Sequence, residues 1–341
     1  MKLSEYKYDL PKSLIAINPP MKRGTSRLLV LNRKTGKILD KKYSDLPEFL
    51  CAGDVLVLND TRVIKARLKV LNKNGDVREL LILEKHSFDS NWYRHRVMYR
   101  HKIKSDEQLR IGDVIITIED VSDDGTAIVR CETDLLELAD EYGEVPLPPY
   151  MHRDANTIDV TRYQTVWAKE KGSVAAPTAS LNMTDDILTT LNNTGITVVY
   201  LTLHVGLGTF LPIRTEKIEN HHMHQEYFEI PKVTVKAIQQ AKLEGMRVIA
   251  LGTTVARTLE YANKALMKPP LNISGEADIF IYPGYEFKTI DALITNYHAP
   301  KSTVLMLTTA FAGWDKLLPA YNHAITEKYQ FLSYGDSMLI Q

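Results

Sequence analysis

The sequence is poor in cysteine, in net charge and in long hydrophobic runs. Cys51 and Cys131 are the only cysteines among 341 residues, which excludes a disulfide framework and any metal site built on C-x-x-C spacing. The 42 basic and 42 acidic side chains cancel, so a nucleic-acid partner would need a local basic patch. No apolar run approaches the roughly 18 residues that a membrane span requires, and the polar amino terminus does not resemble a signal peptide. We therefore expect a cytoplasmic protein without membrane contact.

Four short apolar runs each end at polar residues of chemical use. The runs cover residues 55–58, 198–201, 248–251 and 292–294, and each is typical of a buried strand, with helical patterns after the last two. In an open sheet flanked by helices, ligands bind outside the carboxyl ends of the strands. We therefore expect the following polar residues to form one shared site: Asn59, Asp60, Thr61 and Arg62; Thr202, His204, Gly206, Gly208 and Thr209; Gly252, Thr253, Thr254 and Arg257; Asn296, His298, Pro300 and Lys301.

The length and composition suit one large domain with a smaller one, since 44% of the residues are hydrophobic and 25% are charged. Between about residues 67 and 145 the sequence changes to short strand-like runs separated by the turn signals Asn74-Gly75 and Asp124-Gly125. The sequence therefore predicts an α/β main domain, made of residues 1–66 and 146–341, with a small all-β domain inserted at residues 67–145.

The segment from Gly172 to Thr184, GSVAAPTASLNMT, is rich in small and polar residues. It has too little bulk to form core, and Thr184 is a plausible cap for a helix that ends near Gly195. A loop of small residues that enters a helix amino terminus is a common way to hold a polar ligand. We therefore interpret the segment as a ligand cradle, with a tight surface connection as the alternative.

The densest basic patch lies in the predicted insert, between Arg94 and Lys104. Its cations alternate with aromatic and histidine side chains, and no acidic residue interrupts them. This composition is typical of an RNA-binding surface, although exposed Lys and Arg side chains also form solvated faces without a partner. The candidate cations for nucleic acid are Lys65, Arg67, Arg94, Arg96, Arg100 and Lys102.

A histidine cluster at His221, His222 and His224 precedes Glu226. Period-two spacing would place His222, His224 and Glu226 on one face of a strand, and histidine with carboxylate suits zinc or iron. No Cys or Asp nearby completes a ligand set, so we expect no metal. Acid–base or ligand-binding roles and a purely structural role stay open.

Long motifs occur in a fixed order along nearly the whole chain. They are YDLP at 8–11, SRLLVL at 26–31, GDVLVLNDTRVIKARL at 53–68, PLPPY at 146–150, YQTVWA at 163–168, GSVAAPTA at 172–179, TLHVGLGTF at 202–210, H-x-M-H-x-E at 221–226, GTT at 252–254, IYPGY at 281–285, TNYHAPKST at 295–303, AFAG at 310–313 and SYGDSMLI at 333–340. Together they resemble the S-adenosylmethionine:tRNA ribosyltransferase-isomerase family of queuosine synthesis.

The resemblance implies an enzyme that moves the ribosyl portion of S-adenosylmethionine onto the aminomethyl group of a 7-deazaguanine at the tRNA wobble position. Adenine and methionine leave, and epoxyqueuosine is formed. The resemblance also implies an α/β domain with an inserted β-barrel, and neither a metal nor a redox cofactor, because S-adenosylmethionine is consumed as the ribosyl donor. We expect a monomer whose partners are tRNA and this donor.

The sulfonium charge of the donor acidifies the adjacent ribose C–H and makes methionine a good leaving group, so the protein needs mainly a base and positioned dipoles. A base that removed this proton would allow adenine to be expelled before amine attack and epoxide closure. The candidate bases are His204, His224 and His298, and the carboxylates that would orient a histidine or hold the incoming ammonium are Asp60 and Glu226.

Other polar and aromatic residues are candidates for substrate binding. Hydroxyls that suit the ribose or the methionine moiety belong to Thr178, Thr209, Thr253 and Thr254, cations that suit its carboxylate to Arg257 and Lys301, and rings that suit stacking to Tyr150, Tyr163 and Tyr285. Arg257 has the alternative of pairing with Glu260, and Asp336 has that of a turn carboxylate. The further candidates are Arg62, Ser173, Pro177, Gly206, Gly208, His221 and Asn296.

One motif departs from the family pattern. The family usually reads APTAGLHF where this chain reads APTASLNM, so Ser180, Asn182 and Met183 replace Gly, His and Phe. Asn cannot shuttle a proton near neutral pH, and Ser180 adds a Cβ. Two alternatives follow: an S-adenosylmethionine-dependent enzyme of the same fold with another acceptor, or a tRNA-binding relative without catalysis.

Overall fold

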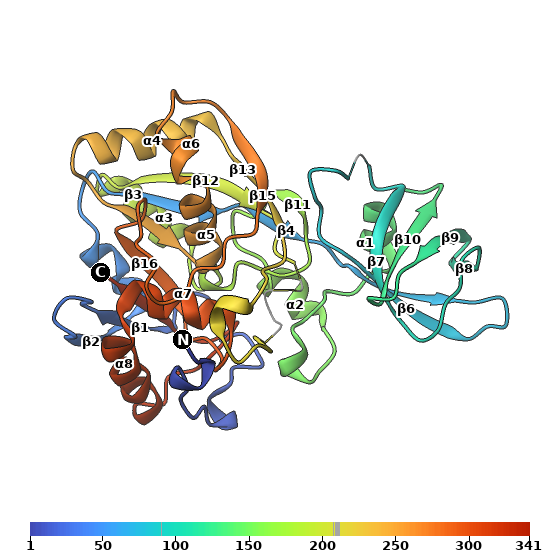
Figure 1. Cartoon of the computed structure of the whole chain (residues 1–341), viewed down its shortest axis with the longest axis horizontal. Helices are drawn as coiled ribbons and strands as arrows, with labels where there is room; N and C mark the ends of the chain where they lie inside the picture. The colour runs from blue at the N-terminus through green and yellow to red at the C-terminus, as the bar shows by residue number, and fades with distance from the viewer. Residues whose placement is uncertain (90, 207, 209–211) are drawn as a thin grey trace.

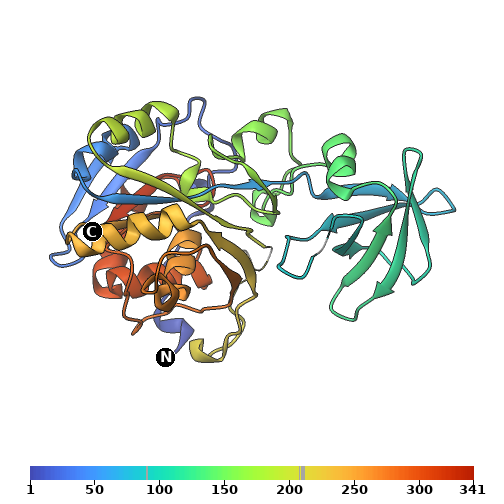
Figure 2. The ribbon, with the colours of Figure 1, turned by 90° about the horizontal axis from the view of Figure 1, so that it is seen from above.

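The computed structural model describes residues 1–341 except 90, 207 and 209–211. Figures 1 and 2 show a large domain with a central sheet and, set to one side of it, a small barrel formed by the segment drawn in cyan to green. The two termini both lie in the large domain. In the part of the chain that is described, no helix is both long and apolar enough to cross a membrane.

A nine-stranded sheet organises the large domain, in the order β15-β13-β12-β3-β14-β16-β17-β1-β2. Its inner strands β12, β3, β14 and β16 are parallel neighbours, and β17 runs antiparallel to β16 but parallel to β1. The strands are β1 (Arg27–Leu31), β2 (Ile38–Lys42), β3 (Val55–Asn59), β12 (Thr197–Leu203), β13 (Glu226–Ile230), β14 (Val248–Leu251), β15 (Ile273–Ala277), β16 (Ala292–Asn296) and β17 (Ser337–Ile340). The four predicted strands are thus confirmed as adjacent strands that point the same way.

Helices cover both faces of this sheet. One face carries α4 (Lys232–Leu243), α5 (Thr253–Tyr261), α7 (Thr303–Ala312) and α8 (Trp314–Thr326), whereas the other carries α3 (Asp185–Asn193) and the 3₁₀ segment Tyr43–Phe49. Shorter helices are α2 (Thr157–Arg162), α6 (Asn263–Leu266) and η5 (Thr178–Ser180). The predicted cap is confirmed, because the Thr184 hydroxyl accepts from the Ile187 N–H at 3.2 Å at the start of α3.

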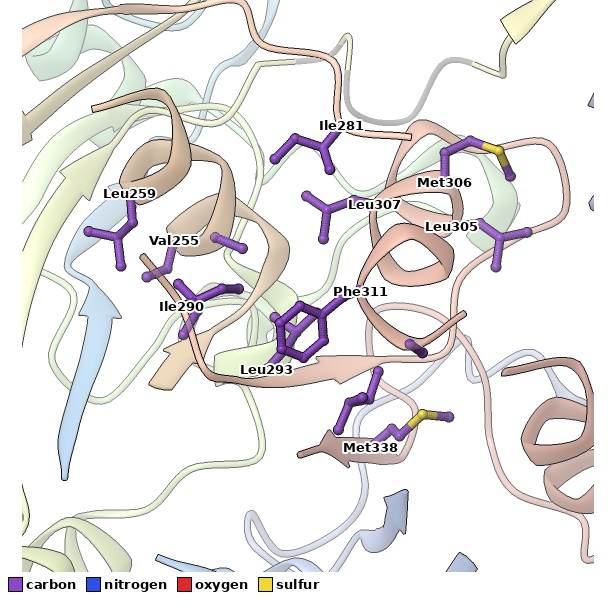
Figure 3. Close-up of a cluster of buried hydrophobic side chains, with 14 of the residues drawn as sticks. Val255, Leu259, Ile281, Ile290, Leu293, Leu305, Met306, Leu307, Phe311 and Met338 are labelled. Atoms are coloured by element: carbon purple, nitrogen blue, oxygen red, sulfur yellow. The ribbon is translucent and has the colours of Figure 1, made fainter. Parts of the chain in front are cut away.

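Strand residues alternate between the two cores, as period-two side-chain orientation requires. Val57 and Leu293 face α5 and α7, while their neighbours Leu56 and Ile294 face α3. Figure 3 shows Val255 and Leu259 of α5 and Phe311 of α7 gathered above Leu293. Burying each such side chain contributes about 1.5–3 kcal/mol. This packing fixes where the two helices begin, at the edge of the sheet.

The inserted segment forms a closed six-stranded antiparallel barrel in the order β10-β7-β6-β5-β8-β9. Its strands are β5 (Arg67–Leu71), β6 (Val77–Ile82), β7 (Arg94–Arg100), β8 (Gln108–Ile111), β9 (Val114–Val121) and β10 (Thr126–Cys131), and α1 (Leu135–Tyr142) follows them. Inward-facing residues such as Leu68, Leu80 and Val129 make a separate core. The α/β fold with an inserted barrel-like domain is therefore confirmed.

Two paired segments connect the barrel to the large domain. The chain enters at Arg67 and returns at Glu144, and these two residues exchange backbone hydrogen bonds of 2.9 and 3.2 Å. The short strands β4 (Thr61–Val63) and β11 (Glu170–Ser173) pair on the main-domain side. A third contact joins His86 Nδ1 to Glu276 Oε2 of β15 at 2.9 Å. Hydrogen bonds therefore hold the barrel to the large domain in addition to the covalent chain.

Candidate active site

A cavity of about 120 Å³ lies at the carboxyl ends of β12, β14 and β16. It collects two of the four predicted polar strand ends, those of β14 and β16. After β12 only the apolar Val205 is among the described lining residues, and none of the described lining residues comes from the end of β3. The lining residues are Tyr150, Ala176, Pro177, Thr178, Ala179, Val205, Gly252, Thr253, Thr254, Thr295, Asn296, Tyr297, His298, Ala299, Ser302, Val304, Leu332 and Ser333. This is the edge of a parallel sheet where ligands are expected.

Two helix amino termini border the cavity. Gly252 to Thr254 begin α5, and Ser302 with Val304 begin α7. The first amide groups of a helix lack intrahelical partners and carry partial positive charge. Gly252 has φ of +100°, a left-handed conformation that a side chain adopts only under strain. The local backbone thus brings N–H donors to a cavity whose described lining residues include no Lys or Arg.

The small-residue segment forms one wall of the cavity. Ala176, Pro177, Thr178 and Ala179 line it, in agreement with the predicted cradle. The expectation that the segment stays out of the core was wrong, because Val174 and Ala175 are fully buried in hydrophobic clusters. Small residues here allow dense packing on one side of the chain and leave space on the other.

His298 is the one candidate base that lines the cavity. Its Nε2 lies 2.8 Å from the Thr295 hydroxyl, and no hydrogen bond of its Nδ1 is found among the described residues. The backbone is held on both sides, since its N–H donates to the Tyr321 hydroxyl at 3.1 Å and its C=O accepts from the Tyr8 hydroxyl. Burial lowers the pKa of His298 to about 3. A positioned, neutral imidazole therefore borders the cavity.

His204 and Asp60 lie outside the cavity lining. His204 is 3% exposed, and its Nδ1 is 2.8 Å from the Thr61 hydroxyl. Burial, followed by the nearby Lys85 charge, lowers its pKa to about 4. The Asp60 carboxylate accepts from the Thr202 hydroxyl at 2.6 Å, and burial raises the pKa of Asp60. His204 thus bonds to β4 and Asp60 to β12, near the place where the chain passes from the large domain into the barrel.

Glu226 and Arg257 form a buried ion pair with an Nη1–Oε2 distance of 2.7 Å. Arg257 also donates to the Ala277 carbonyl at 3.3 Å, and Glu226 accepts from the Gly206 N–H at 3.0 Å. Arg257 therefore pairs with Glu226, and the alternative of a pair with Glu260 is wrong. A buried pair of this kind fixes geometry rather than adding much stability, and here it anchors the chain that follows β12.

The histidine cluster does not share one strand face, because β13 begins only at Glu226. His222 and His224 are exposed, and the ring of His221 packs edge-on against Phe280 at 5.1 Å. Within the described ranges no group of three or more His, Cys, Asp or Glu side chains is arranged to hold a metal ion. Gly208 lies against His224, and Thr209 lies outside the described residues.

The aromatic and acidic candidates have different positions. Tyr150 lines the cavity and donates its hydroxyl to Ser333 Oγ, whereas Tyr163 is fully buried against Tyr334. Tyr285 donates to Glu260 at 3.0 Å. The Asp336 carboxylate accepts from the backbone N–H groups of Arg27 and Gln330, both at 2.7 Å. Asp336 thus ties together the turn before β17.

Two further candidates act on the backbone or face solvent. Ser173 Oγ donates to the Ala175 carbonyl at 2.8 Å and accepts from the Val205 N–H at 2.7 Å, so it supports two cavity walls. Arg62 and Lys301 are exposed, and Lys301 has φ of +61°. Neither side chain lines the cavity.

Asn182, where the family pattern has His, lies away from the cavity in a buried polar cluster. Its Oδ1 accepts from Ser26 Oγ at 2.7 Å, and its Nδ2 donates to the Gly335 carbonyl at 2.9 Å and to Ser337 Oγ at 3.1 Å. Met183 is fully buried in the core beneath α3. Ser180 lies in η5 without positive φ. Asn182 is therefore accommodated by hydrogen bonds and Met183 by packing, whereas Ser180 Oγ is buried without a hydrogen-bond partner among the described residues.

Some of the predicted basic residues border a groove of about 720 Å³ between the barrel and the large domain. Arg67 and Arg100 line it together with the aromatic ring of Tyr99. Arg96 instead donates to His86 at 3.1 Å, and Arg94 pairs with Glu119 at 2.7 Å. Lys65 donates to the Asp140 carbonyl at 2.8 Å, and Lys102 is exposed.

Several lining residues were missed by the sequence reasoning. They are Thr295, Tyr297, Ala299, Ser302, Val304, Leu332 and Ser333. All except Val304 and Leu332 fall inside the TNYHAPKST and SYGDSMLI motifs. Membership of these motifs could therefore have identified five of the positions, although the chemistry of each side chain by itself did not.

Comparison with known proteins yields full-length similarity. A family model described as queuosine biosynthesis protein matches residues 3–340. The chain is 51% identical over 344 residues to an S-adenosylmethionine:tRNA ribosyltransferase-isomerase of Pelodictyon phaeoclathratiforme and 48% identical over 348 residues to one of Halothermothrix orenii, with 100% of each chain covered. The crystal structure of an S-adenosylmethionine tRNA ribosyltransferase from Thermotoga maritima matches at 33% identity with a TM-score of 0.57, covering 99% of this chain and 100% of that one.

Proposed function

The chain belongs to the queuosine biosynthesis protein family, and from this membership we propose that it is an S-adenosylmethionine:tRNA ribosyltransferase-isomerase. It transfers and isomerises the ribosyl moiety of S-adenosylmethionine onto 7-aminomethyl-7-deazaguanine at the tRNA wobble position. The products are epoxyqueuosine in tRNA, adenine and methionine. The observation that carries the proposal is the cavity at the carboxyl edge of the sheet, with a neutral histidine on its wall.

His298 is the base in this proposal. The donor's sulfonium acidifies the neighbouring C–H, and the His298 imidazole is neutral, with one nitrogen 2.8 Å from the Thr295 hydroxyl and the other without a hydrogen bond among the described residues, so it can accept the proton. The hydroxyls of Thr178, Thr253 and Thr254 border the same space and bind polar groups of the donor. His204 and the Glu226–Arg257 pair position the surrounding strands, because their contacts are to protein groups.

The tRNA lies along the groove between the barrel and the large domain. Arg67 and Arg100 meet phosphates there, and Tyr99 offers a ring for stacking on a base. Arg67 lies 4.0 Å from the carboxylates of Glu79 and Asp154, a looser pairing than the 2.7 Å bridge of Arg94 to Glu119. Arg94 and Arg96 contribute less, since neither lines the groove and each has a closer partner in the barrel.

Asn182 gives no reason to favour a different acceptor, because its amide is engaged by three protein groups outside the cavity. The monomeric state, the cytoplasmic location and the lack of a metal or redox cofactor stay predictions.

The test is direct. The purified protein is incubated with S-adenosylmethionine and tRNA that bears the aminomethyl-deazaguanine, and the digested nucleosides are weighed by mass spectrometry. The epoxycyclopentane adduct is expected. A folded sample that gives no adduct beside an active relative would overturn the proposal, and an adduct on another acceptor would replace it.

A further inference from the structure

Three residues that line the cavity carry a buried polar atom without a hydrogen-bond partner among the described residues: Asn296 with Oδ1, Thr254 with Oγ1 and Tyr297 with Oη. The ring of Tyr297 is fully buried and packs against three other aromatic rings. Asn296, which is 2% exposed, and Thr254, which is 7% exposed, are the two of these residues with non-aromatic polar side chains. A polar group that is buried without a partner loses its hydrogen bonds to water and gains none in return, so two such groups on the wall of one cavity call for a partner. The pair indicates that a ligand completes these hydrogen bonds.

The orientation of the Asn296 amide is determined by its surroundings. Its Nδ2 donates to the Leu332 carbonyl at 2.8 Å and to the Ser333 carbonyl at 3.3 Å. Exchanging the nitrogen and oxygen would set a carbonyl oxygen against two others, so the unpaired atom must be the oxygen. Asn296 therefore presents an acceptor and needs a donor from the ligand.

The other residues that line the cavity disfavour a charged ligand. Among the described lining residues there is no Asp, Glu, Lys or Arg, and Ala176, Pro177, Ala179 and Val205 supply apolar surface. A charged group would lose its hydration here without gaining an ionic partner. A neutral, flat group with one N–H donor beside acceptor atoms suits this combination, because the Thr254 hydroxyl is free to donate.

We propose that this cavity is the subsite for the adenine of S-adenosylmethionine, an inference that rests on the function proposed above. The exocyclic amino group donates to Asn296 Oδ1, and a ring nitrogen beside it accepts from the Thr254 hydroxyl. The 7-deazaguanine of the acceptor suits the site less well, since it has carbon at position 7 and places two donors on its pairing edge, which would require a second acceptor.

Binding of free bases to the full-length protein tests the subsite. Adenine is titrated calorimetrically and as an inhibitor, beside hypoxanthine, which carries an oxygen in place of the amino group, and guanine. We expect adenine to compete with S-adenosylmethionine and to bind roughly tenfold or more tightly than either analogue. Equal binding of adenine and hypoxanthine, no binding of adenine, or tighter binding of guanine would overturn the assignment.

A matched pair of variants on α5 adds a structural control. Thr254→Val removes the unpaired hydroxyl at constant shape, and we expect adenine affinity to fall about threefold to tenfold. Thr258→Val lies one turn further along, where the hydroxyl bonds to the Thr254 carbonyl at 2.9 Å and does not line the cavity, so adenine affinity should not change. Equal affinities of both variants and the parent would contradict the role of Thr254.

The failure of this inference can be told apart from that of the proposed function. Adduct formation on tRNA without preferential adenine binding would remove the subsite and leave the function. Preferential adenine binding that Thr254→Val weakens, in a protein that forms no adduct, would support the subsite and overturn the reaction.

Discussion

The cavity at the sheet edge and the groove beside the barrel differ in their charge. The cavity has no formally charged side chain among its described lining residues, whereas the groove contains Arg67, Arg100 and Arg153 together with Glu79 and Asp154. Groups in the first are held by fixed dipoles and hydrogen bonds, which salt hardly screens. Charges in the second face solvent and are screened within about 10 Å at 0.1 M salt. The cavity thus suits a small neutral group held by hydrogen bonds, whereas the groove suits a charged polymer held by salt-dependent electrostatic attraction.

The largest effect on the reaction should come from a substitution in the cavity that leaves the groove intact. His298→Gln removes the basic imidazole nitrogen but keeps an amide that can bond to Thr295, so we expect adduct formation to slow roughly 100-fold or more, with tRNA affinity unchanged. Single-turnover mass spectrometry and filter binding measure the two quantities. His323→Gln is the control, because that histidine pairs with Asp40 on the surface. Retention of more than about a tenth of the rate would exclude His298 as the base.

Acid should lower the free energy of unfolding by a few kcal/mol through His204, which lies outside the cavity. The pKa of His204 falls from 6.5 to about 4 on folding, so below pH 6.5 the unfolded chain binds a proton that the folded chain does not. The stability contribution is complete above pH 6.5 and is lost as pH falls toward 4, at about 1.4 kcal/mol per pH unit. Urea unfolding between pH 7.5 and 4.5 measures it. His204→Gln should remove about 1.4 kcal/mol per pH unit from the slope and leave the equal share of His298, whose pKa is lowered to about 3; an unchanged slope would refute this origin.

Charge reversal in the groove should weaken tRNA binding about tenfold at low salt. In Arg67→Glu combined with Arg100→Glu, two cations that line the groove become anions, while the cavity is untouched. The KM for S-adenosylmethionine should therefore stay constant. Lys236→Glu on exposed α4 is the matched control. An unchanged tRNA affinity at two salt concentrations would remove the groove from the model of tRNA binding.

The smallest effect on the reaction is expected at Asn182. Asn182→Ala removes three hydrogen bonds of a buried cluster, which should lower the free energy of unfolding by about 1–3 kcal/mol. Because the amide lies outside the cavity, kcat/KM at a temperature where the variant is folded should change less than about twofold. A loss of activity in a folded variant would show that this position reaches the chemistry after all.

The sequence predicts the sheet interior well, because runs such as 55–58 and 248–251 are apolar throughout, as strands buried on both faces are. It also predicts the polar strand ends that reach the cavity, since topology alone brings the ends of parallel neighbours together. The sequence does not predict which side chains bond to each other. Arg257 bonds to Glu226, which is 31 residues away, rather than to Glu260 on the same helix, because only the folded sheet brings β13 beside α5.

Asn182 illustrates the same limit over a longer distance. Its partner Ser26 is 156 residues away in the sequence, so no local pattern could reveal that the amide is already satisfied. A departure from a family motif therefore predicts changed chemistry only when the side chain reaches the site. The start of β13 was misplaced for a related reason: its alternation begins at Glu226, and the histidines before it merely share the period.

The position of β17 has a consequence for how the chain is made. Residues Ser337–Ile340 form an interior strand, paired with β16 on one side and with β1 on the other. During synthesis the barrel strands emerge together and can close early, whereas β1 waits for a neighbour more than 300 residues later. The large domain therefore completes its sheet only after residues 337–340 have been made. Loss of residues 337–340 would remove a strand from the middle of the sheet and not from its edge.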